Sequence, residues 1–187
     1  MVIARSKLSL EEFLQLPEEV PSLEYEDGRI TQKVSPKLKH SALQTQLAIL
    51  IQQFADQFDL GMVFIEARTT FAGTSRVPDV AFYRKGRPPV DDNGEVANDV
   101  FVPPDLAIEI RSPGQSLQAQ LRRCRAYVSQ GVALALAVDP DHHRLWVFQA
   151  NGLEMELGHD QPIDFGKVLP GLTLTPRAIF AKLRPRS

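Results

Sequence analysis

Two acidic residues lie inside stretches of sequence that otherwise suit a protein core. Glu109 lies in the run from Leu106 to Arg111, whose apolar residues indicate a β-strand. Because side chains alternate between the two faces of a strand, Glu109 shares a face with Ala107 and Arg111. Burial of a carboxylate is costly unless it is paired or bound to a metal. The simpler alternatives are that an arginine pairs with Glu109 or that the strand lies at an exposed edge.

Asp79 is the second acidic residue, and it follows Pro78 near the start of another predicted strand, Val77–Tyr83. Proline has no N–H, so Pro78 marks a strand start or a sheet edge. By itself Asp79 could equally be a turn residue. Together, however, two carboxylates from two strands of one sheet match the needs of Mg²⁺, which takes a few carboxylate oxygens and leaves room for a substrate phosphate. The pair therefore predicts a site for Mg²⁺ (or Mn²⁺).

A strand–helix–strand unit is predicted to position Glu109. Ser112 and Pro113 supply an N-cap and a proline at the first helical position, opening a helix that runs to about Gln130. The apolar run Val132–Val138 suits a central, buried strand. A helical crossover of this kind joins parallel strands, almost always with right-handed chirality.

The remaining patterns indicate hairpins and helices around this unit. Asp27-Gly28 predicts a hairpin within Leu23–Val34, and the apolar spacing of Leu38–Phe58 predicts a long amphipathic helix. Other expected elements are a short helix opened by Ser9 and ended by Pro17, β-structure in Met62–Phe71, a surface loop at Gly86–Pro104, a strand at Leu145–Gln149 and a last helix capped by Thr175 and Pro176. A mixed sheet with helices packed on it follows.

Composition restricts the class of protein. A chain of 187 residues with 43% hydrophobic residues suits one globular domain, expected to span 1–187. The net charge of -2 excludes a generally basic surface, so nucleic acid must be met through a local patch. A single cysteine, Cys124, excludes an internal disulfide and fits the cytoplasm. The N-terminus lacks the apolar core of a signal peptide and no run is long enough to span a bilayer, so no membrane association is expected.

The acidic motifs also resemble a known family. The segments Val77-Pro78-Asp79-Val80 and Pro103 to Pro113 resemble the Uma family of restriction-endonuclease-like proteins, a bacterial branch of the PD-(D/E)-x-K nuclease superfamily. The resemblance covers roughly residues 8–183. Its further matches are Leu23 to Gly28, Ser35-Pro36 with His40, Arg123 to Gly131, Val138-Asp139-Pro140 and Pro170-Gly171-Leu172.

This resemblance implies a fold, a reaction and a set of residues. The implied fold is the restriction-endonuclease-like three-layer α/β/α fold around a central mixed β-sheet. The implied activity is Mg²⁺-dependent phosphodiester hydrolysis, with Asp79 and Glu109 as metal ligands and Glu24 as a third ligand. A metal there would lower the pKa of a bound water and offset charge on the scissile phosphate.

The chain departs from the superfamily pattern at its lysine. That lysine is expected at 111 or, in this branch, near 123, but both positions are arginine and no lysine lies between Lys85 and Lys167. Arginine keeps its proton and cannot act as a general base. Arg111 or Arg123 can still bind a phosphate and stabilise the transition state electrostatically.

We therefore expect a metal-dependent endonuclease, acting on DNA and assembling as a homodimer or higher homo-oligomer, since cutting a duplex favours two-fold symmetry. Phosphate contacts are expected from two basic runs, one of Lys37 and Lys39 and one that opens with Arg122 and continues with Arg123 and Arg125. His40, at the start of the long helix, is a further candidate. The alternative, which the missing lysine favours, is a catalytically impaired nuclease-fold module that binds nucleic acid or a protein partner. A third possibility is a structural oligomer whose carboxylates pair with Arg111.

Overall fold

The computed structural model describes residues 2–3 and 8–184, so part of the N-terminal stretch assessed for a signal peptide lies outside it. Two sheets make up its frame. One is a six-stranded mixed sheet in the order β11-β10-β9-β8-β7-β4. The other is a five-stranded antiparallel sheet in the order β1-β3-β2-β6-β5.

The elements have the following bounds. The six-stranded sheet contains β4 (Gly61–Ile65), β7 (Val80–Arg84), β8 (Leu106–Ile110), β9 (Leu134–Asp139), β10 (Arg144–Gln149) and β11 (Glu154–Glu156). The five-stranded sheet contains β1 (Val2–Ile3), β2 (Leu23–Glu26), β3 (Arg29–Gln32), β5 (Thr69–Phe71) and β6 (Thr74–Arg76). The helices are α1 (Leu10–Leu14), α2 (Leu38–Gln57), α3 (Leu117–Ser129) and α4 (Pro176–Ala181).

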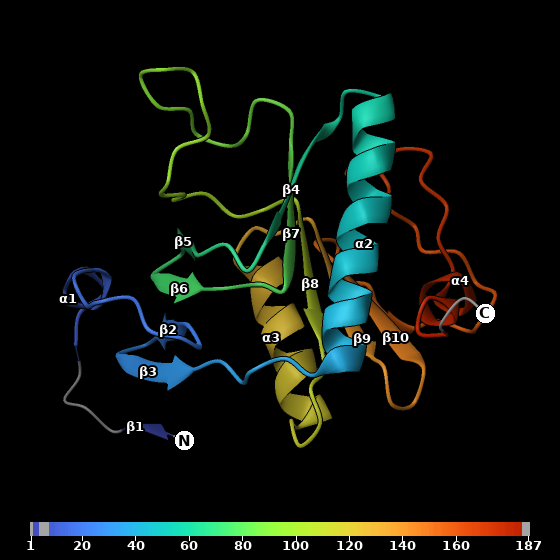
Figure 1. The fold of residues 1–187 in the computed structure, drawn as a ribbon, viewed down its shortest axis with the longest axis horizontal. Helices are drawn as coiled ribbons and strands as arrows, with labels where there is room; N and C mark the ends of the chain where they lie inside the picture. The colour runs from blue at the N-terminus through green and yellow to red at the C-terminus, as the bar shows by residue number, and fades with distance from the viewer. Residues whose placement is uncertain (1, 4–7, 185–187) are drawn as a thin grey trace.

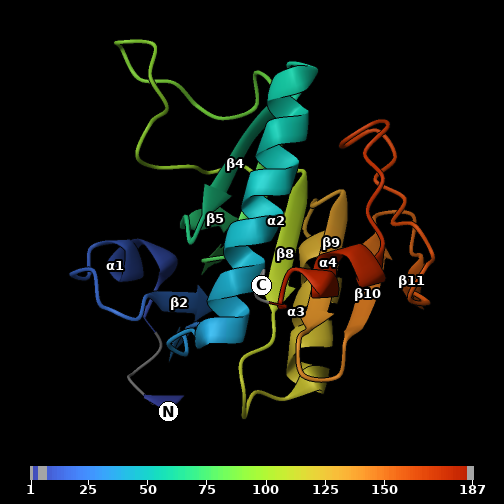
Figure 2. The ribbon, with the colours of Figure 1, turned by 45° about the vertical axis from the view of Figure 1, so that its right-hand side comes forward.

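Helices cover both faces of the six-stranded sheet, which gives three layers (Figure 1). The long helix α2 and the C-terminal α4 lie on one face, and α3 lies on the other (Figure 2). The apolar face predicted for the long helix is confirmed at Leu43, Leu47 and Ile51, which are buried in the first core. The helix ends at Gln57, however, and Phe58 is exposed. This arrangement is the mixed α/β fold expected from the sequence.

The alternation along β8 decides which side chains face each layer. Ile108 and Ile110 pack in the core under α2, whereas Ala107 packs in the separate core under α3. Glu109 is therefore directed toward the α3 side, in the same phase as Ala107. The parallel pairing of β8 with β9 through α3 confirms the predicted crossover unit.

The five-stranded sheet stands at one side of this sandwich with α1 packed against it, at the left of Figure 1. The hairpin β2–β3 turns at Asp27-Gly28 as predicted, and both residues have positive φ. β2 is joined to β6 through the pairing of Tyr25 with Ser75. This hairpin brings one of its faces toward the α3 side of the large sheet.

Several element boundaries differ from the predictions. Helix α3 is capped by Ser116 and begins at Leu117, whereas the predicted cap was Ser112 and the predicted first residue was Pro113. The reason is a turn closed by hydrogen bonds between Ser112 and Gln115 in both directions, with Gly114 at φ +84°. A helix cannot start through a residue in that conformation.

The strands around Asp79 also differ from the predicted ones. The β-prone segment 62–71 is broken into β4 and β5 at Glu66, whose φ is +54°. β7 begins at Val80, so Asp79 lies just before the strand. Strands β1, β6 and β11 were not predicted. The N-caps Ser9 and Thr175 are confirmed. No described helix is long and apolar enough to cross a membrane.

Candidate active site

Asp79 and Glu109 meet because of the register between β7 and β8. Val80 pairs with Ile108 in this antiparallel ladder, so one further step places Asp79 opposite Glu109. Both carboxylates line a pocket of about 140 Å³, which we call the acidic pocket. The other lining residues are Glu24, Thr31, Gln32, Lys33, Val34, His40, Ile110, Ser112, Gln115 and Arg123.

Asp79 is buried, and both of its carboxylate oxygens have hydrogen-bond partners. Its Oδ1 accepts from Lys33 Nζ at 2.7 Å, and its Oδ2 accepts from the Ile110 backbone N–H at 2.6 Å and lies 3.0 Å from His40 Nε2. Burial by itself raises the pKa of this carboxyl, but the hydrogen bonds and charges of His40 and Lys33 outweigh that effect and lower the pKa to about 2. Asp79 is therefore an anion at neutral pH.

Glu109 is buried with one oxygen bonded. Its Oε1 accepts from Tyr127 Oη at 2.7 Å and from Arg123 Nε at 2.8 Å, whereas its Oε2 accepts no hydrogen bond from the described residues. Burial raises the pKa of Glu109, and although Arg123 opposes that effect, the neighbouring Asp79 adds to it. The pairing of Glu109 with an arginine was the simpler alternative considered for this residue, and the structure contains that pair.

Glu24 reaches the site from β2. Both of its carboxylate oxygens accept from the Arg123 guanidinium, one of them at 2.7 Å, and Oε1 also accepts from the Val77 backbone N–H at 2.8 Å. Burial raises the pKa of Glu24, but Arg123 outweighs this effect and lowers it. These bonds leave no oxygen of Glu24 open, so its role as a third metal ligand stays a prediction.

Lys33 is a site residue that the sequence analysis missed. It follows β3 directly, and its Nζ donates to Asp79 Oδ1 and, at 2.8 Å, to the carbonyl of Val77. Burial lowers the pKa of Lys33, but the charges of Asp79 and Glu109 outweigh that effect and raise it, so the amine is a cation. A signal was present in the sequence, because the hairpin turn sets Glu24 opposite Thr31, and Lys33, two residues on, shares that face.

Arg111 does not enter the acidic pocket. Its Nη2 donates to Asp139 Oδ1 at 3.0 Å and lies 3.1 Å from His142 Nδ1. The third possibility, in which the two central carboxylates pair with Arg111, is not what the structure contains. Asp79 bonds Lys33 instead.

The predicted phosphate-binding residues separate into two groups. Lys37, Lys39 and Arg122 are exposed, and Lys39 Nζ donates to Asp141 Oδ1 at 2.8 Å. His40 is buried on Asp79 instead. It lines both the acidic pocket and a wider neighbouring hollow of about 620 Å³ that contains Lys37, Lys39 and Arg111. Arg122 lines neither of these two pockets.

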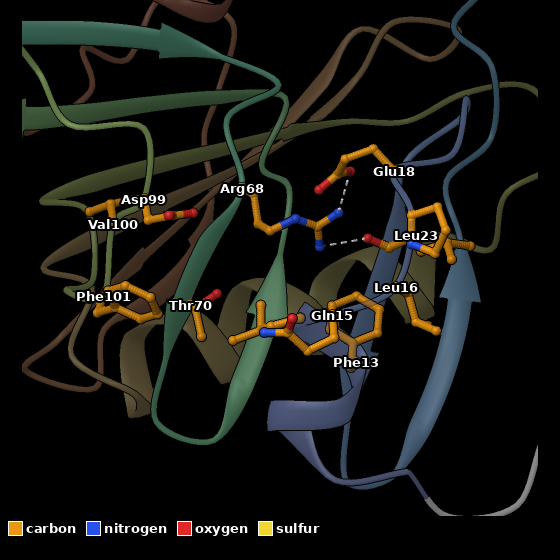
Figure 3. A pocket seen from close by; sticks show the side chains of 12 residues that line it. Phe13, Gln15, Leu16, Glu18, Leu23, Arg68, Thr70, Asp99, Val100 and Phe101 are labelled. Carbon is orange, nitrogen blue, oxygen red and sulfur yellow. Dashed lines mark hydrogen bonds and ion pairs between the residues drawn. The ribbon is translucent and has the colours of Figure 1, made fainter.

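A further pocket, of about 220 Å³, lies between α1 and the loop after β7 (Figure 3). Arg68 lines this pocket. Its Nη2 donates to Glu18 Oε2 at 2.9 Å and its Nη1 donates to the Leu23 carbonyl at 3.0 Å. Leu23 and Glu24 are neighbours on β2, so their side chains leave opposite faces of the strand. The acidic residues that line this pocket are Glu18, which pairs with Arg68, and Asp99. The acidic pocket, which brings Asp79, Glu109 and Glu24 together, is the better candidate for chemistry.

Comparison with known proteins shows the family of the chain. A family model described as "Uma2: Putative restriction endonuclease" matches residues 10–177. The chain belongs to this family. A solved structure from Anabaena variabilis, described as a putative nuclease, superposes with a TM-score of 0.90 at 31% identity, covering 95% of this chain and 99% of that one. No curated protein matched the chain.

Membership of the Uma2 family puts the chain among nucleases, and its acidic pocket can be tested for a metal. Across residues 2–3 and 8–184, no three His, Cys, Asp or Glu side chains are grouped to hold a metal ion. Mg²⁺, however, is commonly held by one or two carboxylates, with water and substrate phosphate completing its shell. Asp79 and Glu109 are such a pair, and Glu109 Oε2 is the open oxygen. The residues present fit Mg²⁺, provided that the bond from Lys33 to Asp79 gives way.

Proposed function

We propose that this Uma2 family member is a divalent-metal-dependent endonuclease that hydrolyses phosphodiester bonds in DNA. The observation that carries the proposal is the pair Asp79 and Glu109, brought to one pocket by the β7–β8 register. These two carboxylates would hold Mg²⁺ or Mn²⁺. When bound, such a metal supplies a water of lowered pKa and positive charge against the phosphate oxygens.

In this proposal the positively charged side chains of the protein attract and bind the phosphate groups of the substrate. Arg123, between Glu24 and Glu109, contributes fixed positive charge at the edge of the pocket. Lys37, Lys39 and Arg111 line the neighbouring hollow, where they would bind the phosphates that flank the cleaved bond. Helix α2 begins at this hollow, and its N-cap, Lys37, makes no side-chain capping bond. Its first backbone N–H groups therefore add an attraction for phosphate.

Assembly and compartment form part of the same proposal. A homodimer would place two such pockets on the two strands of a duplex, and light scattering after size-exclusion chromatography tests it. Cys124 is free and buried, which agrees with a protein kept in the reducing cytoplasm.

The deciding experiment is cleavage of supercoiled plasmid with Mg²⁺, Mn²⁺ or EDTA. Nicking is expected with either metal, and it is expected to be absent with EDTA and in Asp79→Asn and Glu109→Gln. Asp160→Asn, which removes an exposed carboxylate paired with Arg177, is the matched control and should cleave like the wild type. A wild-type protein that binds Mn²⁺ but leaves plasmid intact would contradict the proposal.

A second candidate is a catalytically impaired module that binds nucleic acid or a protein partner. The observation that favours it is that the described cations of the pocket are already bonded to carboxylates, with arginine at both expected lysine positions. Retarded migration of a DNA duplex without metal-dependent cleavage would support it.

A further inference from the structure

The two positions where a catalytic lysine is expected, 111 and 123, are both arginine, but another lysine, Lys33, lines the acidic pocket. Arg111 is directed to Asp139 and lines the neighbouring hollow, not the acidic pocket. Arg123 does line the acidic pocket, but Glu24 binds its two terminal nitrogens and Glu109 binds its Nε. Lys33 bonds Asp79, lines the same pocket as Glu109 and is the one lysine among the lining residues.

The backbone of Lys33 is fixed by the β-ladder, and its ammonium has three acceptors. The Lys33 N–H donates to the Ser22 carbonyl at 2.9 Å, which continues the β2–β3 ladder by one residue. The ammonium then reaches Asp79 Oδ1, the Val77 carbonyl and, more weakly at 3.3 Å, Glu66 Oε1. The Lys33 side chain is only 11% exposed, so its charge acts in a largely water-excluded setting.

The third acceptor of Lys33 is the one most easily given up. Glu66 is 36% exposed and is bonded at 3.0 Å by Gln44, so it keeps a partner when Lys33 leaves. An ammonium is a compact charge with three rotatable donors on a flexible stem, unlike the planar fork of arginine. Lys33 can therefore exchange one acceptor for a phosphate oxygen without moving its backbone.

We propose that Lys33 is the catalytic lysine of this site, supplied from the end of β3 instead of from the acidic strand or α3. In the protein without metal its ammonium neutralises Asp79. If a divalent cation engaged Asp79, Lys33 would release Glu66 as well and turn to a non-bridging oxygen of the scissile phosphate. There it offsets the charge that develops as water adds to phosphorus and the bond to one sugar oxygen breaks. It keeps its proton throughout. The attacking water gives its proton to solvent, and the departing sugar oxygen takes a proton from solvent to leave as a hydroxyl.

This assignment rests on the proposed nuclease function but makes a separate prediction about metal affinity. In the protein without metal, Lys33 competes with a cation for Asp79 Oδ1. Removal of the ammonium leaves the negative charge of Asp79 and Glu109 less neutralised. Mn²⁺ should therefore bind several-fold more tightly. A residue that merely supported the fold would have the opposite effect, because its loss would disorder the metal ligands.

The experiment measures binding and cleavage on the same variants. Lys33→Met and Lys33→Gln are compared with the wild type and with Lys85→Met, which removes an exposed lysine paired with Asp59. Mn²⁺ affinity is measured by electron paramagnetic resonance, and plasmid nicking is measured under single-turnover conditions. We expect both Lys33 variants to bind Mn²⁺ several-fold more tightly than the wild type and to nick about 100-fold more slowly, while Lys85→Met is unchanged.

The outcomes separate the two proposals. Wild-type rates in both Lys33 variants, alongside an inactive Asp79→Asn, would overturn the assignment of Lys33 and leave the nuclease function intact. Weaker Mn²⁺ binding in step with slower nicking would also overturn it, in favour of a structural role. No nicking by the wild type would overturn both. If Lys33→Met fails to fold, as judged by circular dichroism, Lys33→Gln decides alone, because its amide can still donate to Asp79.

Discussion

Arg123 Nη1 donates to Glu24 Oε2 at 2.7 Å across 99 residues of sequence. This bond joins helix α3, on one face of the large sheet, to strand β2 of the small sheet. The same guanidinium bonds Glu109, and its charge is spread over two buried carboxylates. The two sheets are therefore connected at the candidate active site itself.

Loss of this connection should be costly. Arg123→Met leaves Glu24 and Glu109 buried without their cation, which we expect to reduce the free energy of unfolding by about 3 kcal/mol. Urea denaturation measures the change. Arg122→Met removes the neighbouring, exposed arginine and is the control, expected to change stability little. Equal stability of the two variants would mean that Arg123 does not hold the sheets together.

The ion pair of Asp79 should make the stability of the folded protein depend on pH. Its pKa is about 2 in the folded protein against an ordinary 3.8, because the hydrogen bonds and charges of His40 and Lys33 outweigh the effect of burial. A carboxyl with a lowered folded-state pKa stabilises the fold above its unfolded-state pKa and loses this contribution as the pH falls through the folded value. The contribution is about 2 kcal/mol at neutral pH and disappears between about pH 5 and pH 2.

Urea denaturation of the wild type and Asp79→Asn at a series of pH values tests this expectation. The wild type should lose more stability than the variant between pH 5 and pH 3, and the two curves should converge in acid. Parallel curves would show that Asp79 is not the group that titrates.

The exposed lysines near the hollow should bind DNA without regard to its sequence. The double variant Lys37→Ala, Lys39→Ala is expected to lower the affinity for short duplexes. It should also reduce the slope of log K against log salt by about 2, because each lysine that no longer neutralises a phosphate lowers the slope by about one unit. Fluorescence anisotropy in EDTA measures binding without cleavage. Lys182→Ala, at an exposed position on the C-terminal side, is the control. An unchanged salt slope would place the DNA elsewhere on the surface.

Gly61, where β4 begins, is expected to tolerate no side chain. Its φ is +149°, and a Cβ there would lie 2.1 Å from the Tyr83 carbonyl oxygen on the adjacent strand β7. We expect Gly61→Ala to destabilise the protein by about 3 kcal/mol, through backbone strain and displacement of that strand. Gly152→Ala is the matched control, because its φ is also positive (+89°) but no atom lies within 4 Å of the added Cβ. Thermal unfolding that ranks the two variants equally would contradict this account.

Local rules predicted much of the frame. The capping residues Ser9 and Thr175 and the apolar face of α2 are set by contacts within a few residues, and all were predicted correctly. The strand–helix–strand unit around Glu109 was also predicted, because the apolar alternation and the crossover length specify it without reference to the rest of the chain. The start of α3 was missed, because the turn at Gly114 competes locally with the cap at Ser112.

The sequence by itself indicated that Asp79 and Glu109 belong to two strands of one sheet, because strand patterns are local. The pairing of β7 with β8, which sets the two residues opposite each other, came from the tertiary structure. Only the tertiary structure decided what surrounds them. Lys33 reaches Asp79 across 46 residues, and Arg123 reaches Glu24 across 99. The physical reason is that the charge of a buried group is compensated by whichever side chain the packing of distant elements brings within hydrogen-bond distance. No spacing within a single element encodes that choice.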